Sequence, residues 1–285
     1  MAVTRNPNLG PSQMRARRRR LFFIRFSIVL FFLLVIIIAL AILSGHEKVK
    51  VETINISGNA TTTSNEVLAI ARQDMAGRYF YLFSKSNSLI FPRFQIKKDI
   101  LMNIKTIKDV DISWTGWKEI SITLFERKAH SVWCGNDMET INSVCFLVDK
   151  EGYIYSLAPV FSGSMFIKNY GPLAPNQLNN ISHITPIGSY FLPKNIYTQI
   201  YNLIDILDQN NLKIVSVSFD GFDYKFTLEA GPKIIFNEKN DFNSSFQNLF
   251  TAIETKNLDL VKDASLINYI DLRFDNKIVI GKKEK

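Results

Sequence analysis

The hydrophobic pattern of this chain begins with one long apolar run, from Leu21 to Leu43, in which Arg25 is the only charged residue. From Phe26 onward the run contains no charge, proline or glycine, and roughly 20 apolar residues suffice for a helix to cross the hydrocarbon core of a bilayer. Arg25 lies near the start of the run, so its long side chain can reach the lipid headgroups. The pattern predicts a single transmembrane helix over residues 21–44.

The charges on either side of this run predict its orientation. Seven of the 34 basic residues fall within residues 1–25, where there is no acidic residue, whereas residues 46–52 carry charges of both signs. Positive charge beside a span favours the cytoplasmic side. We therefore expect a basic cytoplasmic tail over residues 1–20 and extracytoplasmic domains after the span. The arginines that carry this topology signal are Arg15, Arg17, Arg18, Arg19 and Arg20.

A cleaved secretory signal peptide is the alternative interpretation of the same run. Ala39-Leu40-Ala41 resembles a small-residue cleavage site. The apolar region of a signal peptide is about 7 to 15 residues long, and this run is longer before that site is reached. The length therefore favours an uncleaved anchor.

Residues 49–127 alternate between strand-like and helix-like patterns. A strand over residues 49–56 ends at a Ser-Gly-Asn turn, and Thr63 with Glu66 forms a capping-box pattern for a helix that stops before Gly77. An aromatic connector, a second helix and two alternating strands follow, over residues 79–83 with 90–92, 96–104, 110–114 and 119–125. We interpret the aromatic connector as core or as a loop anchor. The predicted order is strand, helix, helix, strand, strand.

Residues 128–285 show mainly strand patterns, interrupted by two helical ones. Helical spacing begins after Pro193 and again after Asp241, a candidate N-cap. Strands are predicted over residues 132–133, 145–149, 153–155, 165–168, 214–219, 224–228, 233–236, 266–274 and 277–280. The pattern predicts a mixed β domain with two flanking helices.

Several short motifs give these two regions a family resemblance. Ile54-Asn-Ile-Ser-Gly-Asn59, Ile107-Lys-Asp-Val-Asp-Ile112 and Phe125-Glu-Arg-Lys-Ala129 resemble the POTRA domain of the bacterial division protein family FtsQ, also called DivIB. Leu147-Val-Asp149, with Gly152 and Tyr155, is similar to the start of that family's β domain, and Tyr269-Ile-Asp-Leu-Arg-Phe274 to its end. The resemblance implies an α+β protein. It would consist of a transmembrane helix, a βααββ POTRA domain over residues 49–127 and a β domain over residues 128–285.

The two cysteines, Cys134 and Cys145, both fall in the outer region, where disulfides persist. The ten residues between them have the polarity of a hairpin loop. We expect a disulfide that closes this loop. Two buried free thiols are the alternative, because a sequence alone does not establish connectivity.

The chain's net charge of +8 does not predict nucleic-acid binding, because the excess lies in the N-terminal arginines and the remainder is nearly neutral. A basic tail also attracts anionic lipids. The three histidines, His46, His130 and His183, lie far apart without metal-ligand spacing, and no phosphate-binding or nucleophile-elbow motif is present. We expect no cofactor, no small-molecule substrate and no enzyme activity. Catalytic groups that converge from distant positions remain the alternative.

The resemblance implies a noncatalytic scaffold at the division septum of the inner membrane. Its partners would be the bitopic coiled-coil proteins FtsB and FtsL together with other divisome components, and it would help to regulate septal peptidoglycan synthesis. A membrane-anchored POTRA-type chaperone or export and assembly factor is the alternative function.

The resemblance also implies that FtsB docks on the last strand, formed by Lys277, Ile278, Val279, Ile280 and Gly281. A terminal strand can leave unpaired backbone groups at a sheet edge, and a partner strand can add to them. An ordinary edge protected by Lys277, Lys282 and Lys283 is the alternative.

Overall fold

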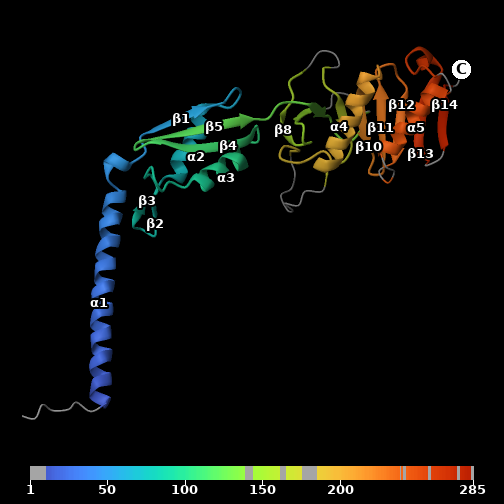
Figure 1. Cartoon of the computed structure of the whole chain (residues 1–285). Coiled ribbons are helices and arrows are strands. Elements are labelled where there is room, and N and C mark those ends of the chain that lie inside the picture. The colour runs from blue at the N-terminus through green and yellow to red at the C-terminus, as the bar shows by residue number, and fades with distance from the viewer. Residues whose placement is uncertain are drawn as a thin grey trace, which may run out of the picture. The chain divides into compact units, whose positions relative to one another are not determined.

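The computed structural model describes residues 11–138, 144–160, 165–174, 185–237, 239, 242–255, 258–274 and 277–283 (Figure 1). The protein is a mixed α/β structure with an apolar N-terminal helix and a sheet-rich body. It divides into two compact units. Unit 1 consists of Met1–Asn103 and Asp109–Phe125, and unit 2 of Ile104–Lys108 and Glu126–Lys285.

The N-terminal helix α1 spans Pro11–Ser44, so it begins ten residues before the predicted span. Its arginine-rich first part continues the helix because arginine, glutamine and alanine are good helix formers. The segment from Arg18 to Ser44 contains an 18-residue stretch with a mean hydropathy of 3.4, and it is long and apolar enough to cross a membrane. Apolar side chains surround it on all sides, which suits a helix in lipid and not one packed on a soluble core.

Besides α1, unit 1 contains a three-stranded sheet with two helices and a short hairpin. The sheet has the order β1-β5-β4, and β1 runs parallel to β5, from the pair Thr53 and Glu119 to the pair Ser57 and Thr123. Trp117 and Lys118 connect β4 to β5. The elements are β1 (Thr53–Ser57), α2 (Ser64–Asp74), β2 (Arg78–Tyr79), β3 (Phe83–Ser84), α3 (Arg93–Asn103), β4 (Ile107–Gly116) and β5 (Glu119–Glu126).

The core of unit 1 follows the predicted helical spacing. Val67 and Ala71 on α2 are fully buried, as are Ile96 and Ile100 on α3. Residues one turn apart lie on the same helix face. The two helices contact each other, and Ile120 and Ile122 on β5 supply the buried face of the sheet.

A strand boundary and a capping contact in unit 1 differ from the predictions. The first strand starts at Thr53 and not at Val49, because Glu47–Val49 forms a 3-10 turn. In this turn the Lys48 N–H group donates to the Nδ1 atom of His46. Thr63 is the N-cap of α2, but its hydroxyl donates to the Glu66 carboxylate at 3.4 Å and makes no hydrogen bond with the helix backbone.

Unit 2 is built on one nine-stranded mixed sheet, in the order β14-β13-β12-β11-β10-β9-β6-β7-β8. Its strands are β6 (Ser131–Trp133), β7 (Phe146–Val148), β8 (Ile154–Leu157), β9 (Lys168–Tyr170), β10 (Ile214–Phe219), β11 (Asp223–Leu228), β12 (Lys233–Asn237), β13 (Ile267–Phe274) and β14 (Lys277–Lys282). Its helices are α4 (Lys194–Gln209), α5 (Phe242–Thr255) and the 3-10 turn η2 (Lys262–Ser265).

Both long helices of unit 2 bury their apolar stripes in the same core. Ile200, Ile204 and Leu207 on α4 are buried, as are Phe246 and Leu249 on α5. The candidate N-cap Asp241 and residues 275–276, which separate the last two predicted strands, lie outside the described residues. The two-helix prediction therefore agrees with the architecture.

One strand of this sheet lies later in the chain than predicted. The pattern indicates residues 165–168, whereas β9 is Lys168–Tyr170 and lies between β10 and β6. The polar Asn169 at its centre is fully buried because its amide donates to the Ser131 hydroxyl and to the Val132 carbonyl. A hydrophobic pattern cannot find a strand whose central buried side chain is polar.

Candidate functional site

The last strand, β14, forms one edge of the nine-stranded sheet (Figure 1). It pairs with β13 in antiparallel register, with Val279 opposite Asp271 and Ile280 opposite Ile270. A strand paired on one side only directs half of its backbone N–H and C=O groups away from its neighbour. Within the described parts of the chain, no segment pairs with the outer side of β14.

The two faces of β14 differ in their packing. Ile278 and Ile280 are partly buried against the core of unit 2. Val279 is also partly buried, but it alternates with them and lies on the opposite face of the sheet, together with the exposed Lys277. The strand therefore presents an open backbone edge supported by a packed inner face.

Charge protects only the ends of this edge. Lys277 and Lys282 lie at the two ends of β14 and are exposed, whereas Ile278 to Gly281 carry no charge. Lys283 follows the strand, and its ammonium donates to the carbonyl of Ala264 at 3.0 Å. The middle of the edge carries no lysine that would discourage a partner strand from pairing with it.

The opposite edge of the sheet, β8, is partly covered by the chain itself. The Ile154 N–H group donates to the Ser189 carbonyl at 2.9 Å, and the Gly188 N–H group donates to the Ile154 carbonyl at 2.8 Å. Tyr153 also forms an isolated β-bridge with Tyr190. Of the two edges, β14 is therefore the one that is more open to a partner strand.

An ion-pair network that sequence reasoning missed holds the strand beside this edge. Arg273 on β13 donates to both carboxylate oxygens of Asp271, at 2.9 and 2.6 Å, and reaches across β12 to Asp223 on β11 at 2.7 Å. Burial alone would raise the pKa of Asp271, but the hydrogen bonds and charge of Arg273 outweigh it and hold the pKa below its ordinary value. The Asp-Leu-Arg motif thus ties β13, the neighbour of β14, to β11 across the intervening β12.

Two other motif residues meet at the opposite end of unit 2. Arg127 forms a hydrogen-bonded ion pair with Asp149, and both side chains are largely buried. The guanidinium of Arg127 also lies over the ring of Tyr153, 4.0 Å from its centre. Asp149 accepts two further hydrogen bonds, from the N–H groups of Glu151 and Tyr153. Because of these contacts, Arg127 and Asp149, each part of a motif that resembles the family, have a structural role.

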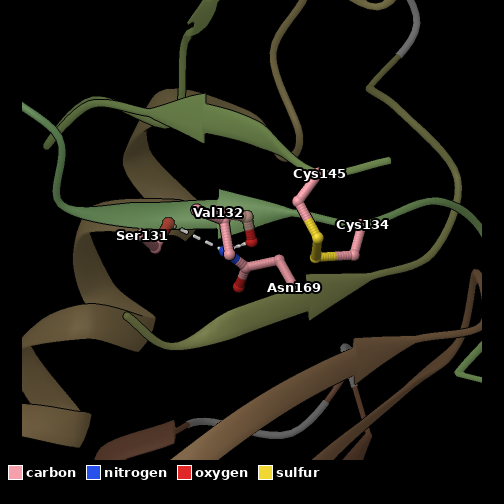
Figure 2. The surroundings of a disulfide bond; sticks show 5 residues. All are labelled: Ser131, Val132, Cys134, Cys145 and Asn169. Atoms are coloured by element: carbon pink, nitrogen blue, oxygen red, sulfur yellow. Dashed lines mark hydrogen bonds between the residues drawn. A yellow bond between two sulfur atoms is a disulfide. The ribbon is translucent and has the colours of Figure 1, made fainter. Parts of the chain in front are cut away.

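Figure 2 shows Cys134 and Cys145 joined by a disulfide beside the buried Asn169. The bond links the end of β6 to the residue that precedes β7. In the same region Asn169 also accepts a hydrogen bond from the Tyr201 hydroxyl at 3.0 Å. Half of the loop between the cysteines, residues 139–143, lies outside the described residues.

The topology arginines and the histidines do not form a common site in the described residues. Arg18, Arg19 and Arg20 are exposed on α1, and Arg15 and Arg17 belong to the same helix. His130 packs on Tyr201 with ring centres 4.8 Å apart, and burial lowers its pKa. His183 lies outside the described residues, among which no group of three or more potential metal ligands occurs.

Comparison with protein-family models and with curated proteins yields no match to this chain.

Proposed function

We propose that this protein is a noncatalytic, single-pass scaffold of the bacterial cell-division machinery, related to the FtsQ/DivIB family. In this proposal α1 anchors it in the inner membrane, the residues that follow α1 lie outside the cytoplasm at the division septum, and the protein holds FtsB- and FtsL-type bitopic proteins. Through them it would influence septal peptidoglycan synthesis. The single observation that carries the proposal is the open backbone edge of β14, next to the Asp271-Leu-Arg273 motif.

The arrangement of unit 1 supports the family assignment. A POTRA domain is a βααββ unit, and here β1, α2, α3, β4 and β5 follow in that order around a β1-β5-β4 sheet. The short β2–β3 hairpin is an addition between the two helices. The assignment of this part of unit 1 as a POTRA domain is part of the proposal.

The open edge suits a partner that adds one strand. Backbone hydrogen bonds to β14 would supply affinity, while the side chains of Val279 and Lys277 would contact the partner on one face. A short extended segment of FtsB meets this requirement. An FtsL-type protein would then be held through its coiled coil with FtsB.

Two adjacent proline substitutions test the docking site. Neighbouring N–H groups along a strand point to opposite sides, so one of Ile278→Pro and Val279→Pro blocks the open edge and the other disrupts pairing with β13. The variant that keeps the native unfolding transition should lose FtsB in pull-downs from dividing cells. Leu157→Pro on β8 is the matched control, because the neighbouring Ala158 N–H group donates inward to the Cys145 carbonyl and the Leu157 N–H group therefore points away from β7. Full capture of FtsB by both proline variants of β14 would mean that docking occurs elsewhere.

Depletion of the protein separates the two candidate functions. Blocked septation with normal outer-membrane composition would support the division role. Loss of outer-membrane or exported proteins with normal septation would support the POTRA-type assembly factor instead. A C-terminal reporter, active only outside the cytoplasm, tests the orientation, and neutral residues in place of Arg17 to Arg20 should reduce its signal.

A further inference from the structure

The short β2–β3 hairpin of unit 1 carries two aromatic side chains that pack on nothing in the described structure. Phe80 is 88% exposed and Tyr81 is 94% exposed, and Leu82 beside them is 43% exposed. The sequence interpretation of this connector as core is therefore wrong for its central residues. Adjacent large apolar side chains this exposed mark an interaction surface more often than isolated ones do.

The backbone at the hairpin tip directs these side chains outward at a conformational cost. Phe80 and Tyr81 have φ angles of 48° and 61°, a region that bulky residues rarely adopt. They occupy the two central positions of a turn closed by the Leu82 N–H group, which donates to the Tyr79 carbonyl at 2.9 Å. Such turns ordinarily carry Asn-Gly. A strained turn that presents two aromatic residues points to a function for them.

The hairpin is attached to the end of the apolar helix α1. The Ser84 N–H group donates to the Ser44 hydroxyl at 3.2 Å, and the Asn87 amide donates to the Ser44 carbonyl at 3.1 Å. Ser44 and Asn87 are both buried. Figure 1 shows the hairpin next to this end of α1. The hairpin therefore begins at the level where the apolar run ends.

The contact also extends into the last turn of the apolar run. Ala41, one turn before Ser44, is partly buried, whereas the described residues from Arg18 to Leu40 are all exposed. β3 is a strand that contacts α1. From Ser84 to the tip at Tyr81 a strand covers about 10 Å, which is comparable with the thickness of one polar interface of a bilayer.

The residues at the base of the hairpin suit lipid headgroups. Arg78 is exposed, and the ammonium of Lys85 lies over the ring of Tyr79, 5.6 Å from its centre. Tyrosine and other aromatic residues concentrate at the headgroup level of membrane proteins, and basic residues there attract anionic lipids. No acidic residue lies between Arg78 and Lys85.

We propose that the β2–β3 hairpin is a second membrane anchor, in which Phe80, Tyr81 and Leu82 enter the lipid interface beside the end of α1. The inference requires only that α1 spans the bilayer and is independent of a role in division. With two attachments, the helix and the hairpin, unit 1 would have a fixed orientation on the membrane surface.

Tryptophan fluorescence of the full-length protein in vesicles tests this anchor. Leu82→Trp places a probe beside the two aromatic residues, in vesicles of zwitterionic and anionic phospholipid. Its added emission should be quenched by lipids brominated near the headgroup and shielded from aqueous iodide. Phe222→Trp, at the exposed β10–β11 turn of unit 2, is the matched control. Its added emission should be quenched by aqueous iodide and not by the brominated lipids. Phe32→Trp, within the apolar run, shows by its lipid quenching whether α1 itself lies in the bilayer.

A second set of variants tests the role of the aromatic side chains without disturbing the turn. Phe80→Asn with Tyr81→Gly supplies the residues that this backbone ordinarily carries, so the hairpin should keep its fold. In that background the Leu82→Trp probe should lose most of its lipid quenching. Equal lipid quenching in both backgrounds would overturn the role of Phe80 and Tyr81. Iodide quenching of Leu82→Trp as strong as that of Phe222→Trp, with Phe32→Trp still quenched by lipid, would overturn the hairpin anchor. Absence of lipid quenching at Phe32→Trp would overturn the membrane span on which it rests.

Discussion

The ring of Tyr269 on β13 lies directly over Gly281 on β14, so closely that a Cβ atom at Gly281 would stand 2.3 Å from the Cε1 atom of the ring. The two residues are opposite each other in the β13–β14 register. An aromatic ring over a cross-strand glycine covers the backbone that the glycine leaves exposed. This contact positions the last strand at the edge where we propose that the partner docks.

Gly281→Ala should displace β14 and destabilise unit 2. Because the added methyl group would overlap the Tyr269 ring, the free energy of unfolding should fall by about 1–3 kcal/mol. Denaturant unfolding measures this change. Gly116→Ala is the matched control, since its added Cβ would meet only ordinary contact at 3.8 Å. Equal stability of Gly281→Ala and the unsubstituted protein would contradict the close packing.

Arg127→Ala should destabilise unit 2 more strongly. Removal of one partner from a largely buried ion pair leaves the Asp149 carboxylate without its counter-charge, which costs about 3 kcal/mol. Lys213→Ala breaks an exposed pair with Glu229 of 3.0 Å and should cost less than about 1 kcal/mol. Similar losses for both variants in denaturant unfolding would contradict the distinction between the two pairs.

The Asp271–Arg273 pair should make stability depend on pH. The pKa of Asp271 lies below its ordinary value of 3.8 in the folded protein, so its contribution is complete above that value. It is lost as the pH falls through the lower, folded-state pKa. Arg273→Gln should therefore lower stability at neutral pH and flatten its decrease in acid. Denaturant unfolding between about pH 7 and pH 3 checks this. An unchanged acid profile would show that the pair does not link protonation to folding.

The disulfide should be intact in the protein isolated from membranes. Closure of the short loop between Cys134 and Cys145 should add on the order of 3 kcal/mol by restricting the unfolded chain. Thiol labelling of the denatured, unreduced protein should detect no reactive cysteine. After reduction it should detect both. Two reactive thiols before reduction would contradict the bond.

Sequence patterns predict the elements whose buried residues are apolar. Helix α4 is found because Ile200, Ile204 and Leu207 recur at helical spacing and are buried. β9 is misplaced because a hydrogen-bonded Asn169, and no apolar residue, lies at its buried centre. The burial of Val67 and Ala71 on one face of α2 likewise follows from their helical spacing alone.

The candidate site depends on relationships that spacing does not contain. The sequence indicates β14 as the last strand, but its place at the sheet edge follows from the strand order. Arg273 reaches Asp223 across an intervening strand, 50 residues earlier in the chain. The exposure of Phe80 and Tyr81 depends on positive φ angles that are unusual for aromatic residues. These features require the three-dimensional arrangement.

Amide hydrogen exchange of the full-length protein, with and without FtsB, tests the central proposal most directly. If a partner strand pairs with the open edge, exchange should slow at alternate residues of β14, from Lys277 to Lys282, because only the outward N–H groups gain partners. The exposed edge residues of β8 should exchange at the same rate in both samples. Unchanged exchange along β14, with protection by FtsB appearing at another surface, would contradict the account.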